Sequence, residues 1–399
     1  MKRRTKVKST EVQSGPRTKP AVSLEAFIFI GALVLFFGLI GHKMGAVNLI
    51  NTIMNTAFNL LMNTVFYIMA VAVVAGALGG VLTEFGVVAL INKLLSPVMK
   101  VVYGLPGAAS IGVVTTFLSD NPAILALADD AGFRRYFKRY QLPALTNIGT
   151  AFGMGAIVCA FMMSLKGVQG GGVGLAILTG LMGAVVGSIV STRLMLLHTK
   201  KVYGTEAFCD VPEGSEETDF NKRTIRDGGI GARMLSALTE GGMSGVKMGM
   251  EVIPGVLIIC TLVLLLTNGP SADGTYTGAV GEGVAVLPWL GQKLSFILKP
   301  LFGFTNAECL SVPITALGAA GAAIGLVPEL VNAGLAGAQD VAVFTAMCMC
   351  WSGYLSTHVA MMSSLKCGFL TGRAIVSHTI GGLCAGFAAH WLFVLFSLI

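Results

Sequence analysis

The chain has 399 residues, of which 54% are hydrophobic and only 12% are charged. Soluble globular domains carry about 25% charged residues, so this composition excludes a soluble enzyme. The net charge of +7 does not indicate a nucleic-acid partner, because most lysines and arginines lie in flanks and loops between apolar segments. That distribution is typical of a membrane protein that obeys the positive-inside rule.

The chain begins with a basic stretch and one apolar segment. Residues 1–20 carry seven lysines or arginines and no apolar core, which predicts a cytoplasmic basic tail and not a cleavable signal. Residues 21–46 contain the first predicted transmembrane helix.

The eight cysteines form no C-x-x-C pair, and most lie inside apolar segments. We therefore expect small buried hydrophobic side chains and not a disulfide framework.

Seven apolar segments reach or approach the length of about 20 residues that a helix needs to span a bilayer. They are residues 24–41, 64–82, 143–163, 173–197, 252–267, 341–363 and 374–396. Two further apolar regions, 104–128 and 304–327, are interrupted by glycine, proline and polar residues. Such interruptions predict re-entrant hairpins that are buried in protein and do not face lipid.

The charges predict an orientation. With the N-terminus inside and both hairpins returning to their own side, 23 of the 27 lysines and arginines fall on the cytoplasmic side. Only Lys43, Lys166, Lys293 and Lys299 fall outside. The positive-inside rule then favours a cytoplasmic N-terminus and an external C-terminus in a bacterial cytoplasmic (inner) membrane.

The chain repeats itself at an offset of 200 residues. The segments AFGMGAIVCAFMMSLK and WSGYLSTHVAMMSSLK share Gly153 with Gly353 and end in the same Ser-Leu-Lys triplet. We predict two repeats, residues 47–197 and 248–398, separated by a cytoplasmic loop at 198–247. The helices ahead of the two hairpins run in opposite directions in this topology. The predicted fold is an all-α polytopic membrane protein with an inverted-topology repeat, about seven transmembrane helices and two re-entrant hairpins.

The first hairpin carries a polar break. Asp120 and Asn121 precede Pro122, the order expected of an N-cap and a first helical turn. A half-helix that starts there would aim its backbone N–H groups and positive dipole end into the protein, where a polar or anionic group of a solute could bind. The alternative is that both side chains only cap the half-helix.

The second hairpin carries Thr305, Asn306, Glu308 and Ser311 in an otherwise apolar run. A carboxylate at that depth is costly unless it is paired, protonated, hydrated or used. These four residues are therefore predicted to bind substrate. The alternative is a Glu308 that lies at the external mouth of the hairpin.

Two predicted spans add polar residues at comparable depth. Asn147 lies in the first half, and Tyr354 and His358 share one helix face in the second half. All three are candidate substrate-binding residues. An intramembrane histidine could relay protons, and a hydrogen-bonded packing histidine is the alternative. The M-C-M-C run at 347–350 suggests a copper or iron path only weakly, because Cys348 and Cys350 face different ways on a helix.

A further polar feature is a stripe of asparagines that recurs every three or four residues and gives one helix a long polar face. Its members are Asn48, Asn51, Asn55, Asn59 and Asn63.

The sequence contains no P-loop, H-E-x-x-H or G-x-S-x-G motif. We therefore expect no enzyme activity and no cofactor.

The run LLSPVMKVVYGLPGAASIGVVTTFLSDNPAI, followed by a basic turn and a glycine-rich helix, resembles the nucleoside-recognition (Gate) domain of bacterial membrane proteins. The run ILKPLFGFTNAECLSVPITALGAAGAAIG resembles a second such unit, and the resemblance covers about residues 47–398. Gate domains occur in spore maturation membrane proteins, in the membrane part of ferrous-iron transporter B and in concentrative nucleoside transporters. The resemblance implies a gated permease.

Together these features predict a secondary transporter of a small polar solute, with a nucleoside or related metabolite among the candidates. One repeat would move against the other around a site made by the hairpin tips. A proton, sodium or solute gradient would supply the energy. Two alternatives stay open: a non-transporting assembly or sporulation-type protein with the same fold, and a metal-ion permease. The expected partners are the solute and the lipid bilayer, and association into a homo-oligomer stays open.

Overall fold

The computed structural model describes residues 20–398 except positions 120, 130, 210–221, 224 and 272. Regular structure in this part of the chain is helical, apart from one isolated bridge between Lys138 and Phe208. Six helices there are long and apolar enough to cross a membrane. They are Leu24–Met44, Ala46–Glu84, Ala144–Met163, Val173–Tyr203, Ile230–Thr267 and Gly368–Phe396. The fold is thus the predicted all-α polytopic membrane fold.

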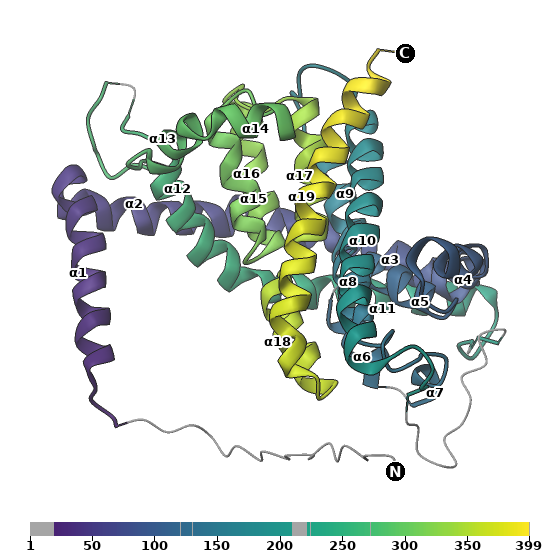
Figure 1. Ribbon diagram of the computed structural model, residues 1–399. Helices are drawn as coiled ribbons and strands as arrows, with labels where there is room; N and C mark the ends of the chain where they lie inside the picture. Colours follow the sequence, from purple (N-terminus) through teal and green to yellow (C-terminus); the bar gives the residue numbers. More distant parts are fainter. Residues whose placement is uncertain are drawn as a thin grey trace, which may run out of the picture.

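Helix α1 (Leu24–Met44) stands upright at the side of the molecule and contacts α2 (Ala46–Asn59) (Figure 1). Gly45 separates the two helices with a φ of +84°, a conformation that glycine adopts without strain and that lets the chain turn sharply. Most apolar side chains of α1 are exposed, including Phe27 and Leu39. This surface is suited to lipid.

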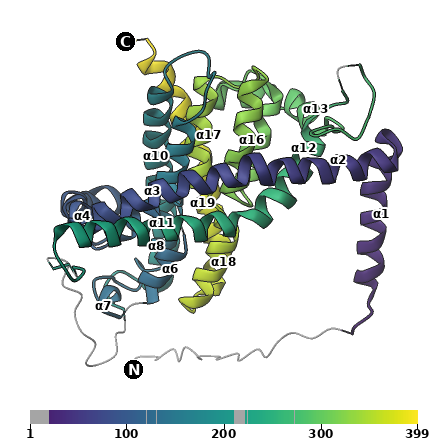
Figure 2. The same cartoon turned by 180° about the vertical axis from the view of Figure 1, so that it is seen from behind.

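Two long helices cross the upright ones, as Figure 2 shows. In the first, α2 continues through the π-helical segment η1 (Leu60–Val65) into α3 (Phe66–Glu84). In the second, α11 (Ile230–Gly255) continues through the π-helical segment η3 (Val256–Cys260) into α12 (Thr261–Thr267). Helices α3 and α11 pack side by side over much of their length.

Both predicted hairpins consist of two helices joined by a short break. The first has α5 (Ala109–Leu118) and α6 (Pro122–Asp129), and it follows α4 (Val87–Val98) and the π-helical η2 (Met99–Tyr103). The second has the 3₁₀ turn η4 (Ala307–Leu310) with α15 (Ser311–Ala316), followed by α16 (Ala320–Asn332). The remaining short helices are α7 (Ala131–Arg134), α13 (Val286–Lys293) and α14 (Ser295–Phe302).

Two spans that we predicted as continuous helices are broken, which corrects the prediction for 143–163 and 341–363. The first is divided into α8 (Ala144–Thr150) and α9 (Gly155–Met163), and the second into α17 (Ala338–Cys350) and α18 (Tyr354–Ser364). Met154 and Gly353 have φ values of +55° and +58°. A left-handed residue interrupts the right-handed helix, so each span ends and restarts at that point.

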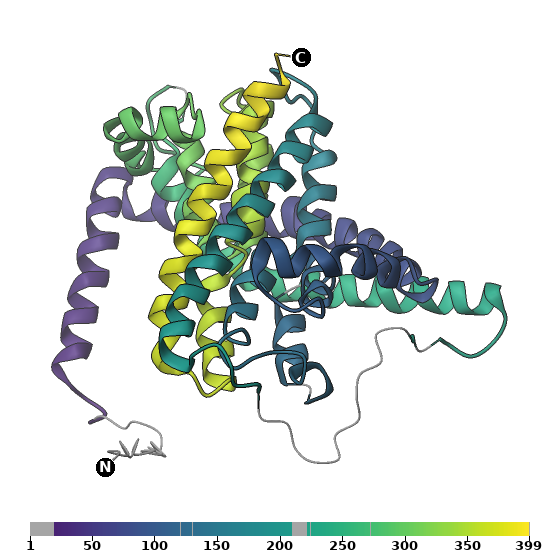
Figure 3. The same cartoon turned by 45° about the vertical axis from the view of Figure 1, so that its right-hand side comes forward.

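The upright core contains α10 (Val173–Tyr203) and α19 (Thr371–Phe396), which lie side by side (Figure 3). A 3₁₀ turn, η5 (Gly368–Leu370), precedes α19. The predicted loop at 198–247 is shorter in the structure, because α10 continues to Tyr203 and α11 already begins at Ile230. Gly241 and Gly245 leave room for the backbone of α3, which allows α11 to pack closely against that helix.

Candidate functional site

A cavity of about 300 Å³ lies where the breaks of both hairpins and both broken spans meet. We call it the central cavity. The breaks contribute four groups of lining residues, and α11 and α18 supply the rest of the wall. The lining residues are Asn121, Met154, residues 318–322, Ser352 and Gly353 from the breaks, Glu251, Val252 and Gly255 from α11, and Thr357 from α18.

Asn121 joins the two halves of the chain at this cavity. Its side chain is 4% exposed, and its amide Nδ2 donates a hydrogen bond to the main-chain oxygen of Ser352. Its Oδ1 has no hydrogen-bond partner in the described part of the chain. A Cβ on Gly153 would overlap Asn121 Oδ1, so only glycine at this position leaves room for the asparagine. Asp120, the other candidate from this break, lies outside the described residues.

Among the described residues that line the central cavity, Glu251 is the one with a charged side chain. It lies on α11 and is exposed. Sequence reasoning missed it because the predicted span began one residue later, at 252. An acidic residue directly before an apolar span was the signal that could have found it.

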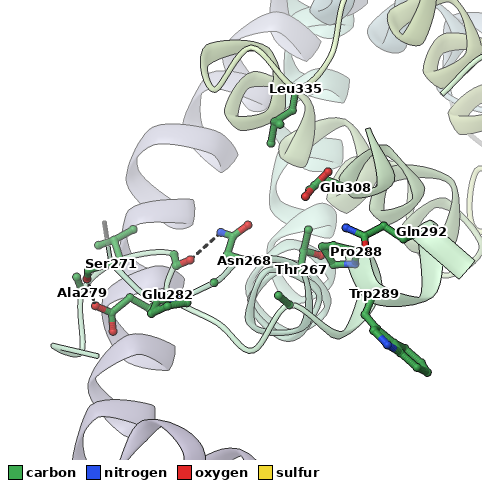
Figure 4. Close-up of a pocket in the computed structure, with 15 residues that line it drawn as sticks. Thr267, Asn268, Ser271, Ala279, Glu282, Pro288, Trp289, Gln292, Glu308 and Leu335 are labelled. Carbon is green, nitrogen blue, oxygen red and sulfur yellow. Dashed lines mark hydrogen bonds between the residues drawn. The ribbon is translucent and has the colours of Figure 1, made fainter. Parts of the chain in front are cut away.

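The structure places Glu308 in a different pocket, of about 700 Å³, which we call the outer pocket. Figure 4 shows Glu308 pointing into the space between Thr267, Gln292 and Leu335. At the edge of this pocket, Asn268 Nδ2 donates to the main-chain oxygen of Gly281 at 2.7 Å. The carboxylate of Glu308 therefore lies at the mouth of the second hairpin and does not reach the central cavity.

Two other predicted residues of the second hairpin, Asn306 and Ser311, form hydrogen bonds that stabilise its turn. Asn306 Nδ2 donates to the main-chain oxygen of Leu335 at 2.6 Å, and Ser311 Oγ donates to the main-chain oxygen of Glu308 at 2.6 Å. Thr305 is exposed. None of these three lines the central cavity.

Asn147 lies in a buried polar contact behind the central cavity. It is fully buried, and its Nδ2 donates to Ser191 Oγ at 2.9 Å and to the main-chain oxygen of Ala374 at 3.0 Å. These bonds tie α8 to α10 and α19. The structure thus gives Asn147 a packing role between three helices.

Tyr354 and His358 belong to the same buried layer. The Tyr354 hydroxyl bonds Thr379 Oγ1 at 2.8 Å, and His358 Nδ1 bonds the main-chain oxygen of Tyr354 at 2.7 Å. The His358 ring lies 4.7 Å from the ring of His378. Neither Tyr354 nor His358 lines the central cavity, although Thr357 beside them does. Among the described residues, no group of three or more His, Cys, Asp or Glu side chains is placed to hold a metal ion.

The asparagine stripe supports the loop between α12 and α13. Asn48 Nδ2 donates to the main-chain oxygen of Tyr276 at 2.8 Å, and Asn55 Nδ2 donates to that of Gly278 at 2.9 Å. Farther along the stripe, Asn59 and Asn63 line a third cavity of about 350 Å³, which we call the side cavity. Its other polar residues are Thr56, Thr64, Tyr67, Glu329 and Asn332.

Glu282 anchors the same loop from within. Its side chain is 4% exposed, and its carboxylate accepts hydrogen bonds from Ser271 Oγ at 2.6 Å, Thr277 Oγ1 at 2.8 Å and the Gly278 amide at 3.0 Å. Burial by itself raises the pKa of this carboxyl, but the hydrogen bonds outweigh burial and lower the pKa to about 2. The charged carboxylate therefore holds the loop in place.

Comparison with known proteins identifies the fold. No protein-family model and no curated protein sequence matches the chain. Solved structures of CNTnw, a concentrative nucleoside transporter, do match. A double variant in an outward-facing state aligns with a TM-score of 0.52 at 14% identity, over 93% of this chain and 86% of that chain. The inward-facing, substrate-bound structure gives a TM-score of 0.52 at 16% identity, over 94% and 85%. The chain therefore has a CNT-like fold.

Proposed function

We propose that the protein is a secondary transporter that moves a small polar solute across the membrane by alternating access. The observation that carries this proposal is the central cavity, where the breaks of two hairpins and two broken spans meet. Broken helices inside a membrane protein are the usual construction of solute sites in transporters. Structures of CNTnw in outward-facing, intermediate and inward-facing states, which share this fold, support the proposed cycle.

The residues of the cavity suggest how the site would work. Asn121 and Glu251 would contact the solute, while the bond from Asn121 to the main chain of Ser352 would keep the two halves in register around it. Glu308 in the outer pocket would meet the solute on its way in or out. We further propose a cytoplasmic N-terminus in a bacterial inner membrane and coupling to a proton or sodium gradient. Nucleosides are the first solutes to test, because CNTnw transports them.

Uptake by the purified protein in liposomes tests the proposal. A thermal-shift screen against nucleosides, bases, amino acids and metal ions would first select ligands, because a ligand of the folded state raises the unfolding temperature. We expect saturable uptake of a selected ligand. Asn121→Ala should reduce this uptake at least tenfold. The matched control is Asn55→Ala, which also removes one amide-to-carbonyl bond but lies away from the central cavity.

An absence of uptake would contradict the proposed transport. Folded protein that shows no saturable uptake of any stabilising ligand under proton, sodium or solute gradients is not a transporter of those ligands. A protein of the same fold that serves only in assembly would give that result.

A further inference from the structure

A pocket of about 720 Å³ lies between α4 and α5, beside the end of α3, and takes no part in the proposed transport site (Figure 1). We call it the basic pocket. Three cationic side chains line it, Lys93 from α4 and Lys222 and Arg223 from the segment before α11. No acidic residue is among its described lining residues. The pocket therefore has a positive potential that suits an anionic ligand.

The carboxylates at this end of α3 and α11 are bonded to other arginines. Glu84, the last residue of α3, accepts hydrogen bonds from Arg226 Nη1 at 2.6 Å and from Arg233 Nε at 2.7 Å. Glu240 on α11 accepts a hydrogen bond from Arg226 Nε at 3.0 Å. These two carboxylates therefore do not neutralise Lys93 or Arg223 in the basic pocket.

Helix α4 directs apolar side chains outward and polar side chains inward. Val87, Leu90 and Leu94 recur every three or four residues and are exposed, whereas Asn92 and Ser96 are half-buried and line the basic pocket. A surface helix of a soluble protein has the opposite arrangement. Leu90 also lines the pocket, so the apolar outer face of α4 reaches its rim. This face is suited to lipid.

An apolar groove of about 580 Å³ lies next to the basic pocket, between α3, α5 and α9. Its lining residues are all apolar or glycine, and α3 contributes those between 70 and 82. Leu82 at one end of the groove directly precedes Thr83, which lines the basic pocket. Val74 and Leu78 in the groove are 71% and 59% exposed. A charged pocket and an apolar groove thus adjoin along one helix, which is the arrangement that an amphiphilic ligand requires.

We propose that the basic pocket and the apolar groove together bind one anionic phospholipid of the phosphatidylglycerol type. Lys93 and Arg223 would bind its phosphate, and one acyl chain would lie along α3. Residues 70–82 extend over about 18 Å of helix, and one leaflet of the hydrocarbon core is about 15 Å thick, so the groove is long enough for a chain. Free phosphate would leave the groove empty, and the cations would repel the ammonium group of a zwitterionic headgroup. Basic pockets between the helices of membrane proteins bind such anionic headgroups.

A comparison of headgroups tests the ligand class. Protein purified in detergent is heated with dioleoyl phosphatidylglycerol, with the same mole fraction of dioleoyl phosphatidylcholine, or with inorganic phosphate. We expect phosphatidylglycerol to raise the unfolding temperature, because a ligand of the folded state stabilises it, and the other two to give less than a fifth of that shift. An equal shift with phosphatidylcholine would overturn the proposal. An equal shift with inorganic phosphate would also overturn it, in favour of a site for free phosphate.

The double variant Lys93→Gln/Arg223→Gln tests the basic pocket. Both side chains are exposed, so glutamine fits at both positions, and the shift caused by phosphatidylglycerol should fall at least fivefold. Lys100→Gln/Lys201→Gln is the matched control, because it removes the same charge from exposed positions that do not line the pocket. An equal loss in the two double variants would show that the lipid responds only to net charge, which would contradict a specific site.

Fluorescence quenching tests the apolar groove. Leu78→Trp introduces an indole in the groove, and Leu35→Trp introduces one on the exposed surface of α1. In phosphatidylcholine bilayers with a small fraction of phosphatidylglycerol brominated on its acyl chains, we expect the indole at position 78 to be quenched at least twofold more strongly. The excess should disappear when Lys93→Gln/Arg223→Gln is added. Equal quenching at the two positions would overturn the placement of the acyl chain. None of these measurements depends on uptake, so the lipid site and the proposed transport are tested separately.

Discussion

Gly153 and Gly353 coincide in the sequence repeat at an offset of 200 residues, yet each is glycine for a different reason. Gly353 has a φ of +58°, which side chains disfavour. Gly153 has no such conformation, but a Cβ there would overlap Asn121 Oδ1 and lie 3.0 Å from Ser352 Cβ. Gly353 therefore permits the break of a helix, and Gly153 permits the first hairpin to approach the second half of the chain.

Two asparagines with different surroundings give the first prediction. Asn121→Ser should lower solute affinity about tenfold, equivalent to about 1.4 kcal/mol, because the serine hydroxyl cannot replace both the donor and the acceptor of the amide. Asn147→Ser should instead lower the free energy of unfolding by about 1–3 kcal/mol and leave the affinity of the folded fraction unchanged, because its partners are Ser191 and the main chain of Ala374.

Ligand titration and thermal unfolding of the two variants, measured side by side, check this prediction. Full affinity in Asn121→Ser would reduce that residue to a link between the hairpin and Ser352. Reduced affinity in folded Asn147→Ser would instead assign Asn147 to the site.

Glu282 gives a pH prediction. Its pKa of about 2 in the folded protein lies below the ordinary value of 4.5. The folded state thus binds the proton less readily than the unfolded state, so the stability from this carboxylate is complete above about pH 4.5 and is lost as the pH falls toward 2. Glu282→Gln should therefore unfold at a lower temperature than the parent at pH 7, and the difference should shrink between pH 4.5 and 2. A difference in unfolding temperature between Glu282→Gln and the parent that stays the same from pH 4.5 to 2 would show that Glu282 does not anchor the loop.

At the scale of elements, the contact between α3 and α11 depends on the absence of side chains. A Cβ on Gly76 would overlap the main-chain oxygen of Gly241, and a Cβ on Gly80 would overlap that of Ala237. Backbones that approach this closely gain van der Waals contact inside a membrane, where the hydrophobic effect does not drive helices together. The two long helices of the two halves are thus held together by their glycines.

Gly76→Ala tests this contact. The added methyl group should force the helices apart and lower the free energy of unfolding by about 1–3 kcal/mol. Gly31→Ala on α1 is the control, because a Cβ there meets no atom within 4 Å. Denaturant titration of the two variants in detergent compares them. Equal stability of Gly76→Ala and Gly31→Ala would mean that the α3–α11 contact can relax without cost.

Some helices and breaks could be predicted from the sequence, and others could not. The two hairpins were predictable because glycine, proline and polar residues interrupt an apolar run. The breaks between α8 and α9 and between α17 and α18 were not, because residues on both sides of each break are apolar or small and the first break turns on Met154, a non-glycine residue with positive φ. A hydropathy pattern indicates which segments are apolar, but it does not indicate where a backbone dihedral angle ends a helix.

The site was predictable to a smaller extent. Asn121 was found because a polar residue before proline marks a helix start, and it lines the central cavity. Glu308 and Asn147 were chosen for their polarity, but polarity does not tell which buried group bonds to neighbouring helices and which faces a cavity. That distinction depends on contacts between residues far apart in the chain, such as Asn121 with Ser352.

At the scale of the whole molecule, the orientation can be tested by labelling. The loop after α9 lies at the end of the molecule where α19 ends, and α1 begins at the other end (Figure 3). On a background without reactive native cysteines, Lys166→Cys in intact cells should react with a membrane-impermeant reagent, and Lys222→Cys should react only after the cells are opened. Both positions are exposed in the structure. Equal labelling of the two positions in intact cells would contradict the inverted topology.

Helix α16 is shared by two cavities. Its first residues, 320–322, line the central cavity, and its last turns, with Glu329 and Asn332, line the side cavity. This helix of 13 residues is about 20 Å long and contains Pro328 beside the side cavity, so a single helix connects the two cavities. A drug-like molecule wedged in the side cavity would therefore immobilise the wall of the central cavity without occupying it. Its kinetic signature would be noncompetitive inhibition, in which the maximal rate falls while the apparent affinity for solute is unchanged.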